Sequence, residues 1–352
     1  MSSMPSATRP LTATEWVASL SPWPEEFGLD RMRQLLTVLG DPQRGFPSVH
    51  VVGTNGKSTA TRTIAALLRA EGLQAGAYTS PHVSGWHERL DCDPEAFERA
   101  VARIREPAEE LGATQFEALT AAALAEFAEA GVDVAVVEAG LGGRLDATNV
   151  VDAPVVLLTN IALEHTEVLG DTPEQIAKEK LAVAHAARIV VMSDNTFSEL
   201  VPPGARVVIG GAREAAEAYV DRPIQHEVEV ALPGRLERRG GEVWDGAHTT
   251  EAVDWLLARL PAREYVLCVS ILGDKRIDEL LTRLARAGRK LVATRSTNPR
   301  ALPEDELAAR AEPHFEEVET VADPTAALAR ARTFGSPVLV TGSLYLLADL
   351  YS

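Results

Sequence analysis

Short runs of β-branched residues alternate with longer alanine- and leucine-rich segments over residues 48–220. The short runs are continuously apolar, as in strands buried on both faces, and the longer segments have the apolar period of amphipathic helices. We predict strands at 50–52, 133–138, 154–158 and 189–192, and helices at 58–70, 95–111, 116–130 and 172–187. This alternation is typical of a parallel sheet flanked by helices.

A second series of the same kind follows Pro233-Gly234, with strands predicted near 243–245, 265–270, 290–293, 317–320 and 338–341. The helical pattern stops over 221–231, where Pro223 interrupts it, so this stretch is the predicted linker. A chain of 352 residues is also long enough for two domains. We therefore predict two α/β domains, at residues 1–228 and 229–352.

Composition narrows the possible partners and the location. The chain has 34 Lys and Arg residues against 51 Asp and Glu, a formal charge of −17, so it lacks the basic surface that a nucleic-acid partner requires. Its two cysteines support neither a disulfide framework nor a zinc site. No signal-peptide pattern and no membrane-spanning apolar run is found. We expect a cytoplasmic protein that binds neither nucleic acid nor membranes.

The strongest local motif directly follows the predicted strand at 50–52 and opens the predicted helix at 58–70. Its residues are Gly53, Thr54, Asn55, Gly56, Lys57 and Ser58. Glycines allow the backbone to wrap around a phosphate, a helix N-terminus offers N–H groups, and the Lys57 ammonium can neutralise terminal phosphates. The Ser58 hydroxyl can bind Mg²⁺. An ordinary glycine turn before a helix is the alternative interpretation.

This loop and a long ordered series of further motifs resemble the folylpolyglutamate synthase and dihydrofolate synthase branch of the Mur ligase superfamily. The motifs are TSPH at 79–82, FEALT at 116–120, EAGLGGRLDATN at 138–149, LGDT at 169–172, IAKEK at 176–180, PGR at 233–235, DGAH at 245–248, GDK at 273–275 and TGS at 341–343. The resemblance spans nearly everything beyond about residue 30. It implies a P-loop-containing parallel-sheet ATPase domain followed by a smaller Rossmann-like α/β domain.

The resemblance also implies an activity. Members of this branch are ATP-dependent ligases that activate a carboxylate as an acyl phosphate, which an amine then attacks. For this chain the implied substrates are ATP, L-glutamate and a folate-type carboxylate, with two Mg²⁺ ions as cofactors, and we expect a monomer. Positioning and charge neutralisation supply most of the catalysis in such phosphoryl transfers.

Residue roles follow from the resemblance position by position. Catalysis is assigned to Lys57, Glu138, His165 and Lys180. Nucleotide binding is assigned to the phosphate loop with Arg235, Asp245 and His248. Substrate binding is assigned to Ser80, His82, Phe116, Glu117, Arg144, Leu145 and Asp146. The metal ions are assigned to Ser58, Ser80, Glu138, His165 and Lys180, and Lys180 resembles a lysine that is carbamylated in this family.

Four of these residues have a structural alternative. His165 has many uses as an ordinary structural histidine. Lys180 lies beside Lys178 and Glu179, and its spacing alone favours a solvated helical lysine. Asp245 suits a turn that caps the following helix. Phe116 and Leu119 are spaced as a pair of core residues on a helix.

The chain departs from the family pattern at a few places. Ser58 stands where the folate branch usually has a glycine, and in this detail the loop resembles the cell-wall Mur ligases instead. Glu164 stands where the family usually has an aspartate before the histidine. Thr249-Thr250 replaces Asn-Pro, Arg276 replaces an acidic residue, and the interval 180–233 is shortened. Two further hypotheses therefore stand beside folate ligation: a Mur-type ligase acting on another carboxylate, and a paralogue that binds nucleotide without ligating.

Overall fold

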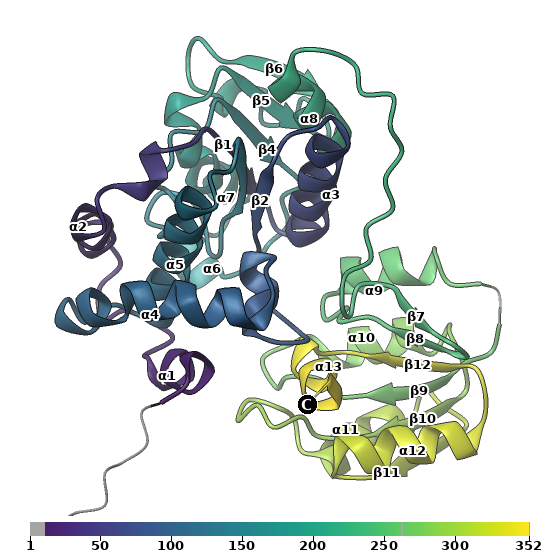
Figure 1. Cartoon of the computed structure of the whole chain (residues 1–352). Helices are drawn as coiled ribbons and strands as arrows, with labels where there is room; N and C mark the ends of the chain where they lie inside the picture. The colour runs from purple at the N-terminus through teal and green to yellow at the C-terminus, as the bar shows by residue number, and fades with distance from the viewer. Residues whose placement is uncertain (1–10, 262, 352) are drawn as a thin grey trace, which may run out of the picture. The chain divides into compact units, whose positions relative to one another are not determined.

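The computed structural model of the protein describes residues 11–261 and 263–351, and Figure 1 shows their course. The chain forms two compact units. Unit 1 runs to Pro81 and then from Trp86 to Val230, whereas unit 2 comprises His82–Gly85 and the chain from Ala231 onward. The short segment His82–Gly85, which lies within the loop after a unit 1 strand, was not expected in the second unit.

Unit 1 contains a six-stranded parallel sheet with the order β2-β3-β1-β4-β5-β6. Its strands are β1 (Ser48–Val52), β2 (Ala75–Tyr78), β3 (Val134–Glu138), β4 (Val155–Leu158), β5 (Ile189–Met192) and β6 (Arg206–Ile209). All residues of β1, β3 and β4 are buried, which explains their continuous apolar runs. Because β1 lies between β3 and β4, the carboxyl ends of these three strands meet at one edge of the sheet.

Helices cover both faces of this sheet. They are α1 (Ala13–Ser19), α2 (Asp30–Val38), α3 (Lys57–Ala70), α4 (Pro94–Glu110), α5 (Gln115–Glu129), α6 (Thr166–Leu169), α7 (Pro173–Lys180) and α8 (Ala212–Val220), with short 3₁₀ turns η1 (Pro42–Arg44), η2 (Trp86–Leu90), η3 (Leu181–Ala186) and η4 (Ser198–Leu200). Val49 and Val51 of β1 pack in one cluster with α3 and α8. Ala135 and Val137 of β3 pack in another with α1, α2, α4 and α5.

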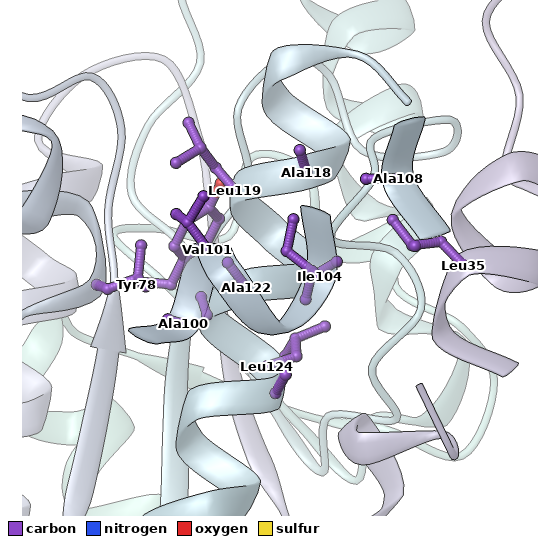
Figure 2. Close-up of a cluster of buried hydrophobic side chains, with 14 of the residues drawn as sticks. Leu35, Tyr78, Ala100, Val101, Ile104, Ala108, Ala118, Leu119, Ala122 and Leu124 are labelled. Atoms are coloured by element: carbon purple, nitrogen blue, oxygen red, sulfur yellow. The ribbon is translucent and has the colours of Figure 1, made fainter. Parts of the chain in front are cut away.

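The second cluster is the larger core of unit 1. Figure 2 shows Ala100, Val101, Ile104 and Ala108 of α4 against Ala118, Leu119, Ala122 and Leu124 of α5, with Leu35 of α2 and Tyr78 of β2 beside them. The small alanine side chains allow α4 and α5 to pack closely. Each buried leucine or isoleucine contributes about 1.5–3 kcal/mol relative to an exposed one.

Unit 2 repeats the design with the strand order β11-β10-β9-β12-β8-β7. All of its strand pairs are parallel except β7–β8. The strands are β7 (Glu237–Arg239), β8 (Glu242–Trp244), β9 (Val266–Val269), β10 (Lys290–Ala293), β11 (Glu317–Thr320) and β12 (Val338–Thr341). The helices are α9 (Thr250–Leu257), α10 (Ile277–Leu284), α11 (Glu304–Ala311), α12 (Pro324–Phe334) and α13 (Leu344–Tyr351). Helices α9 to α11 pack on one face, and α12 and α13 on the other.

The α/β fold class predicted from the sequence is confirmed, but one predicted helix is wrong. The segment 172–187 is not continuous: α7 ends at Lys180, and the 3₁₀ turn η3 follows, with a non-helical Ala184. Leu181, Val183 and Ala184 are buried in a cluster with β4 and β5, and this packing turns the chain away from the helix axis. The sequence analysis also missed β2, β6 and β7.

The predicted linker 221–231 is held on unit 1 over much of its length. Ile224 is buried, and the backbone carbonyls of Ile224 and His226 accept hydrogen bonds from Arg213 of α8. His226 Nδ1 lies 2.7 Å from a carboxylate oxygen of Glu71. Among residues 11–261 and 263–351, no helix is long and apolar enough to cross a membrane.

Candidate functional site

The predicted phosphate loop lies at the carboxyl end of β1 and leads directly into α3. Gly53 has a φ of 142°, and a Cβ built on it would lie 2.0 Å from Thr159 Oγ1, so only glycine fits. Gly56 caps α3 with a φ of 78°. Lys57 Nζ donates to the carbonyl oxygens of Gly53 and Thr54, both at 3.1 Å. The unpaired N–H groups at the start of α3 and the Lys57 ammonium together suit a phosphate group.

The phosphate loop is hydrogen-bonded to the segment that follows β4. Thr54 N donates to Asn160 O at 3.0 Å, and Asn55 N donates to the Asn160 side-chain oxygen at 2.9 Å. Thr159 Oγ1 donates to Asn55 O at 2.8 Å. The sequence analysis missed Thr159 and Asn160. The sequence does show that both residues directly follow an apolar strand. That position indicates a contact with the phosphate loop only when β4 is known to lie beside β1.

Ser58, Ser80 and Glu138 come together at the ends of β1, β2 and β3. Ser58 Oγ donates to Glu138 Oε1 at 3.1 Å, and Ser80 N donates to Glu138 Oε2 at 3.0 Å. Glu138 is 1% exposed. Within the described part of the chain, no three His, Cys, Asp or Glu side chains gather as a metal site. Hydroxyl and carboxylate oxygens are nevertheless the donors that Mg²⁺ prefers, so Ser58 and Glu138 fit that ion, and Ser80 lies beside them.

Lys180 is buried beside the phosphate loop. Its side chain is 3% exposed, and Nζ donates to Gly53 O at 2.8 Å and to Glu164 Oε1 at 3.0 Å. The alternative interpretation as a solvated lysine is therefore wrong. Burial lowers the pKa of the Lys180 ammonium, Lys57 lowers it further, and Glu164 opposes both. Burial raises the pKa of Glu164, but Lys180 and Lys57 outweigh that effect and hold it below its usual value.

His165 follows Glu164 and has a left-handed backbone, with φ 47°, at the start of α6. Its side chain is about half exposed, and Nδ1 lies 3.8 Å from Glu167. The positive charge on this imidazole when protonated also helps to lower the pKa of Glu164. The structure thus places His165 beside the Lys180–Glu164 pair, while its role as a metal ligand stays a prediction.

The glycine-rich loop after β3 is organised around Asp146. This carboxylate is 5% exposed and accepts hydrogen bonds from Leu141 N at 2.8 Å, from Thr148 N at 3.0 Å and from the Thr148 hydroxyl. Burial raises the pKa of Asp146, and these hydrogen bonds oppose the shift. The first role of Asp146 is therefore to hold its own loop, and its contact with substrate stays a prediction.

The same loop packs on the end of α7. A Cβ on Gly143 would lie 2.5 Å from Lys180 O, so the loop backbone touches the residue that carries the buried ammonium. Arg144 is half exposed, and its Nε donates to Glu179 Oε2 at 3.0 Å. Leu145 is 45% exposed. Arg144 and Leu145 are thus accessible to a ligand, as a substrate-binding role requires.

Phe116 and Glu117 lie at the start of α5. The Phe116 ring lies against Gly140, where a Cβ would come within 2.5 Å of it, and its centroid is 6.0 Å from that of Tyr78. Glu117 Oε2 accepts from Thr114 N at 2.8 Å and from Arg31 Nε at 2.9 Å. Glu117 therefore caps α5 and pairs with Arg31, a partner that sequence analysis missed. The contacts with substrate that are predicted for Phe116 and Glu117 stay predictions.

The remaining predicted site residues belong to unit 2. Asp245 follows β8 and accepts hydrogen bonds from Leu236 N at 2.7 Å and Ala247 N at 2.9 Å. It is thus a turn residue, but it does not cap α9, because Thr249 does. His248 Nδ1 lies 2.8 Å from Gly246 O. Arg235 lies in the adjoining turn, and His82 is in the segment His82–Gly85 of the same unit.

Two of the cavities that the described residues form lie in unit 1. One, of about 250 Å³, lies at the carboxyl ends of β4 and β5, and Asn160, which holds the phosphate loop, lines it with Met192 and Phe197. The other, of about 560 Å³, is lined by residues that include Arg33, Phe46 and His185, and it contains no predicted site residue. The first cavity lies at the sheet edge where α/β proteins bind ligands.

Comparisons with known proteins agree with this arrangement. Residues 51–229 match the Mur ligase middle domain, and residues 234–344 match the Mur ligase, glutamate ligase domain. The chain is 32% identical to a dihydrofolate synthase/folylpolyglutamate synthase of Mycobacterium tuberculosis, over 83% of this chain and 80% of that protein. It is 28% identical to the Bacillus subtilis protein of the same name, over 96% and 97%.

Solved structures are similar over nearly the whole length of the chain. Folylpolyglutamate synthase of Mycobacterium tuberculosis, complexed with ADP and AMPPCP, has a TM-score of 0.83 at 28% identity, covering 92% of this chain and 95% of that one. Escherichia coli FolC, in complex with DHPP and ADP, has a TM-score of 0.82 at 26% identity, covering 99% and 98%.

Proposed function

Because the chain belongs to the Mur ligase family, in its folylpolyglutamate synthase and dihydrofolate synthase branch, we propose that it joins L-glutamate to a folate-type carboxylate. ATP is cleaved to ADP and phosphate in the reaction. The observation that carries this proposal is the meeting of the phosphate loop, the Ser58–Ser80–Glu138 oxygen cluster and the Lys180–Glu164 pair at one end of β1 and its neighbours.

The reaction has two steps. A carboxylate oxygen of the folate compound attacks the γ-phosphorus of ATP, and the bond to the β-phosphate oxygen breaks, which gives an acyl phosphate and ADP. The amine nitrogen of glutamate then attacks the acyl carbon, phosphate leaves, and the nitrogen loses a proton. The α3 N-terminus holds the phosphates, and Lys57 turns from the loop carbonyls to the terminal phosphates, where its charge offsets theirs.

Mg²⁺ is the metal that the oxygen cluster fits, and when bound it neutralises charge on the phosphate oxygens. Ser58 and Glu138 would hold it, with Ser80 beside them. We further propose a second ion served by Lys180, which contacts Glu164, and by His165, which follows Glu164 in the chain. A titration of ATP-dependent phosphate release with Mg²⁺ or Mn²⁺ tests this: Lys180→Met and His165→Ala should both raise the metal concentration required.

Lys180 can supply an oxygen ligand to Mg²⁺ only as a carbamate, because its ammonium is cationic and its neutral amine offers nitrogen alone. In that modification the neutral Nζ attacks CO₂, an N–C bond forms, and one proton is released. A buried amine close to Lys57 favours the neutral form, whereas the ion pair with Glu164 favours the ammonium. The carbamate would be an anion close to the Glu164 carboxylate, and a second metal ion bound there would offset the repulsion between the two charges.

Carbon-13 NMR tests the modification directly. Incubation with ¹³C-bicarbonate and Mg²⁺ should give a carbamate signal in the wild-type protein that is lost in Lys180→Arg. Lys178→Arg, a change at an exposed lysine of the same helix, should keep the signal. A spectrum without any such signal under turnover conditions would remove carbamylation from the proposal, while leaving the ligase reaction open to its own test.

We place the flat heterocycle of the folate compound near Phe116 and the loop 140–149, where the aromatic ring, Arg144 and Leu145 are accessible in part. Phosphate release from ATP tests the whole proposal, with Mg²⁺, L-glutamate and either dihydropteroate, tetrahydrofolate or no acceptor. Release that requires both glutamate and a folate compound, with a product heavier by one glutamyl unit, supports it. ATP binding without turnover of any folate acceptor would overturn it in favour of another carboxylate.

A further inference from the structure

A buried histidine lies behind the site and is not used by the proposed reaction. His50 is in the middle of β1, is 0% exposed, and has Nε2 2.9 Å from Thr148 Oγ1. The Thr148 hydroxyl in turn hydrogen-bonds to Asp146 Oδ1. Thr148 is also 0% exposed, so the three side chains form a chain of contacts closed to solvent.

The direction of these hydrogen bonds can be worked out. Asp146 already accepts backbone N–H groups on both oxygens, so the Thr148 hydroxyl hydrogen is donated to it. A hydroxyl has one hydrogen, and His50 Nε2 must therefore donate to Thr148 Oγ1. His50 Nδ1 then carries a lone pair only. In the part of the chain that the structure describes, Nδ1 is buried and has no hydrogen-bond partner. An unpaired buried acceptor is less costly than an unpaired buried N–H group, so this tautomer fits the site.

The path of the backbone explains why the histidine is there. The connection from β3 to β4 must cross β1, which lies between them, and it does so on the face opposite to Val49 and Val51. His50 lies on that crossed face, three residues before Gly53 opens the phosphate loop. The strand β1 therefore leads into the phosphate loop at its end, and in its middle it carries His50, the donor that holds the glycine-rich loop.

We propose that His50 and Thr148 are positioning residues that hold Asp146 and the glycine-rich loop in a fixed place relative to the phosphate loop. They thereby set where the carboxylate substrate meets the γ-phosphate of ATP. This inference rests on the proposed function, because it assigns the glycine-rich loop to the folate substrate. The hydrogen-bond relay from His50 through Thr148 to Asp146 is independent of that assignment, because it rests only on the contacts of these three residues.

Matched pairs of variants test the positioning role. His50→Gln keeps an N–H donor near the place of Nε2, and Thr148→Ser keeps the hydroxyl, whereas His50→Leu and Thr148→Val remove them. The removing variants should raise the KM for the folate acceptor about tenfold, the change that 1.4 kcal/mol produces, with the KM for ATP and glutamate unchanged. The conservative variants should restore most of that loss. A fall of kcat that disappears when activity is normalised to the folded fraction, with every KM unchanged, would mean a purely structural role and would overturn the proposal.

The relay has a readout that is independent of the reaction. In histidine labelled with ¹⁵N, His50 should show a protonated Nε2 and a bare Nδ1, with no titration between pH 5 and 8, because burial lowers its pKa to about 3. Thr148→Val should shift the Nε2 signal, and His50→Gln identifies it by its loss. A protonated Nδ1 would overturn the relay. Failure of the wild-type enzyme to glutamylate any folate compound would instead reject the proposed function, and the nitrogen signals would still decide the relay.

Discussion

Replacing Lys180 with methionine should destabilise unit 1. The buried Nζ donates to Gly53 O and Glu164 Oε1, and methionine fills a similar volume without either hydrogen bond. A hydrogen bond to a charged group contributes about 1.5–3 kcal/mol, and breaking a fully buried ion pair costs about 3–5 kcal/mol. Glu164 is 24% exposed and can regain water, and Gly53 O keeps its contact with Lys57. We therefore expect the lower part of this range, about 2 kcal/mol.

The measurement is native-state hydrogen exchange of the β1 and β3 amides, which reports unit 1 without requiring two-state unfolding of the whole chain. A double-mutant cycle with Glu164→Gln should give a coupling of about 1–2 kcal/mol for this pair. Lys178→Met, at an exposed position of α7, is the matched control and should change stability by less than about 0.5 kcal/mol. CO₂-free buffer keeps Lys180 as an amine.

The pH dependence of the cycle gives a second check. Because the folded pKa of Glu164 is lowered, its contribution is fully present above its ordinary pKa of about 4.3 and is lost as the pH falls through the folded value. The folded pKa of Lys180 is also lowered, so stability again rises with pH, here between that folded value and the ordinary value of about 10.4, because burial disfavours the ammonium form. A coupling near zero at pH 7 would refute the ion pair and the magnitude derived from it.

Three further changes have definite expected results. Lys57→Ala should slow phosphate release about 10²–10³-fold, measured against Lys178→Ala, which should be unaffected. Gly143→Ala should cost about 1–3 kcal/mol and lower exchange protection in α7, because the new Cβ would lie 2.5 Å from Lys180 O. Asp245→Asn should destabilise unit 2 by about 1–2 kcal/mol, since one carbonyl oxygen cannot replace two acceptors in the same geometry. Amides of β8 and β9 that exchange as in the wild-type protein would contradict this last result.

The fold could be predicted where a pattern is local. Fully buried parallel strands appear as short apolar runs, and β5, β10, β11 and β12 have the predicted bounds. The strand β2 was missed because its sequence, Ala-Gly-Ala-Tyr, contains no β-branched residue. Residues at both ends of β6 are exposed, so it also lacks a buried run. Helix α7 was extended too far because the packing of η3 against β4 and β5 is tertiary.

The site divides in the same way. The phosphate loop was predictable because strand, loop and helix are consecutive in the chain. Thr159 and Asn160 were not, because their contact with Asn55 depends on β4 lying next to β1. Arg31 and His50 were missed for the same reason, since their partners are distant in sequence. Local order indicates which loop binds phosphate, and strand order decides which residues support it.

The departures from the family pattern also have a physical explanation in the structure, because each departing side chain has a partner. Ser58 stands where a glycine is usual, and its hydroxyl adds an oxygen beside Glu138 that glycine would not supply.

Thr250 and Arg276 are two separate departures that contact each other: Arg276 Nη2 donates to Thr250 Oγ1 at 3.2 Å, between α9 and the residue before α10. A proline at 250 has no side-chain acceptor, and an acidic residue at 276 has no donor, so neither change alone creates this bond. Both side chains are therefore required for this contact. Their contact lies in the α9–α10 layer of unit 2, which leaves the oxygen cluster and the Lys180–Glu164 pair of unit 1 intact.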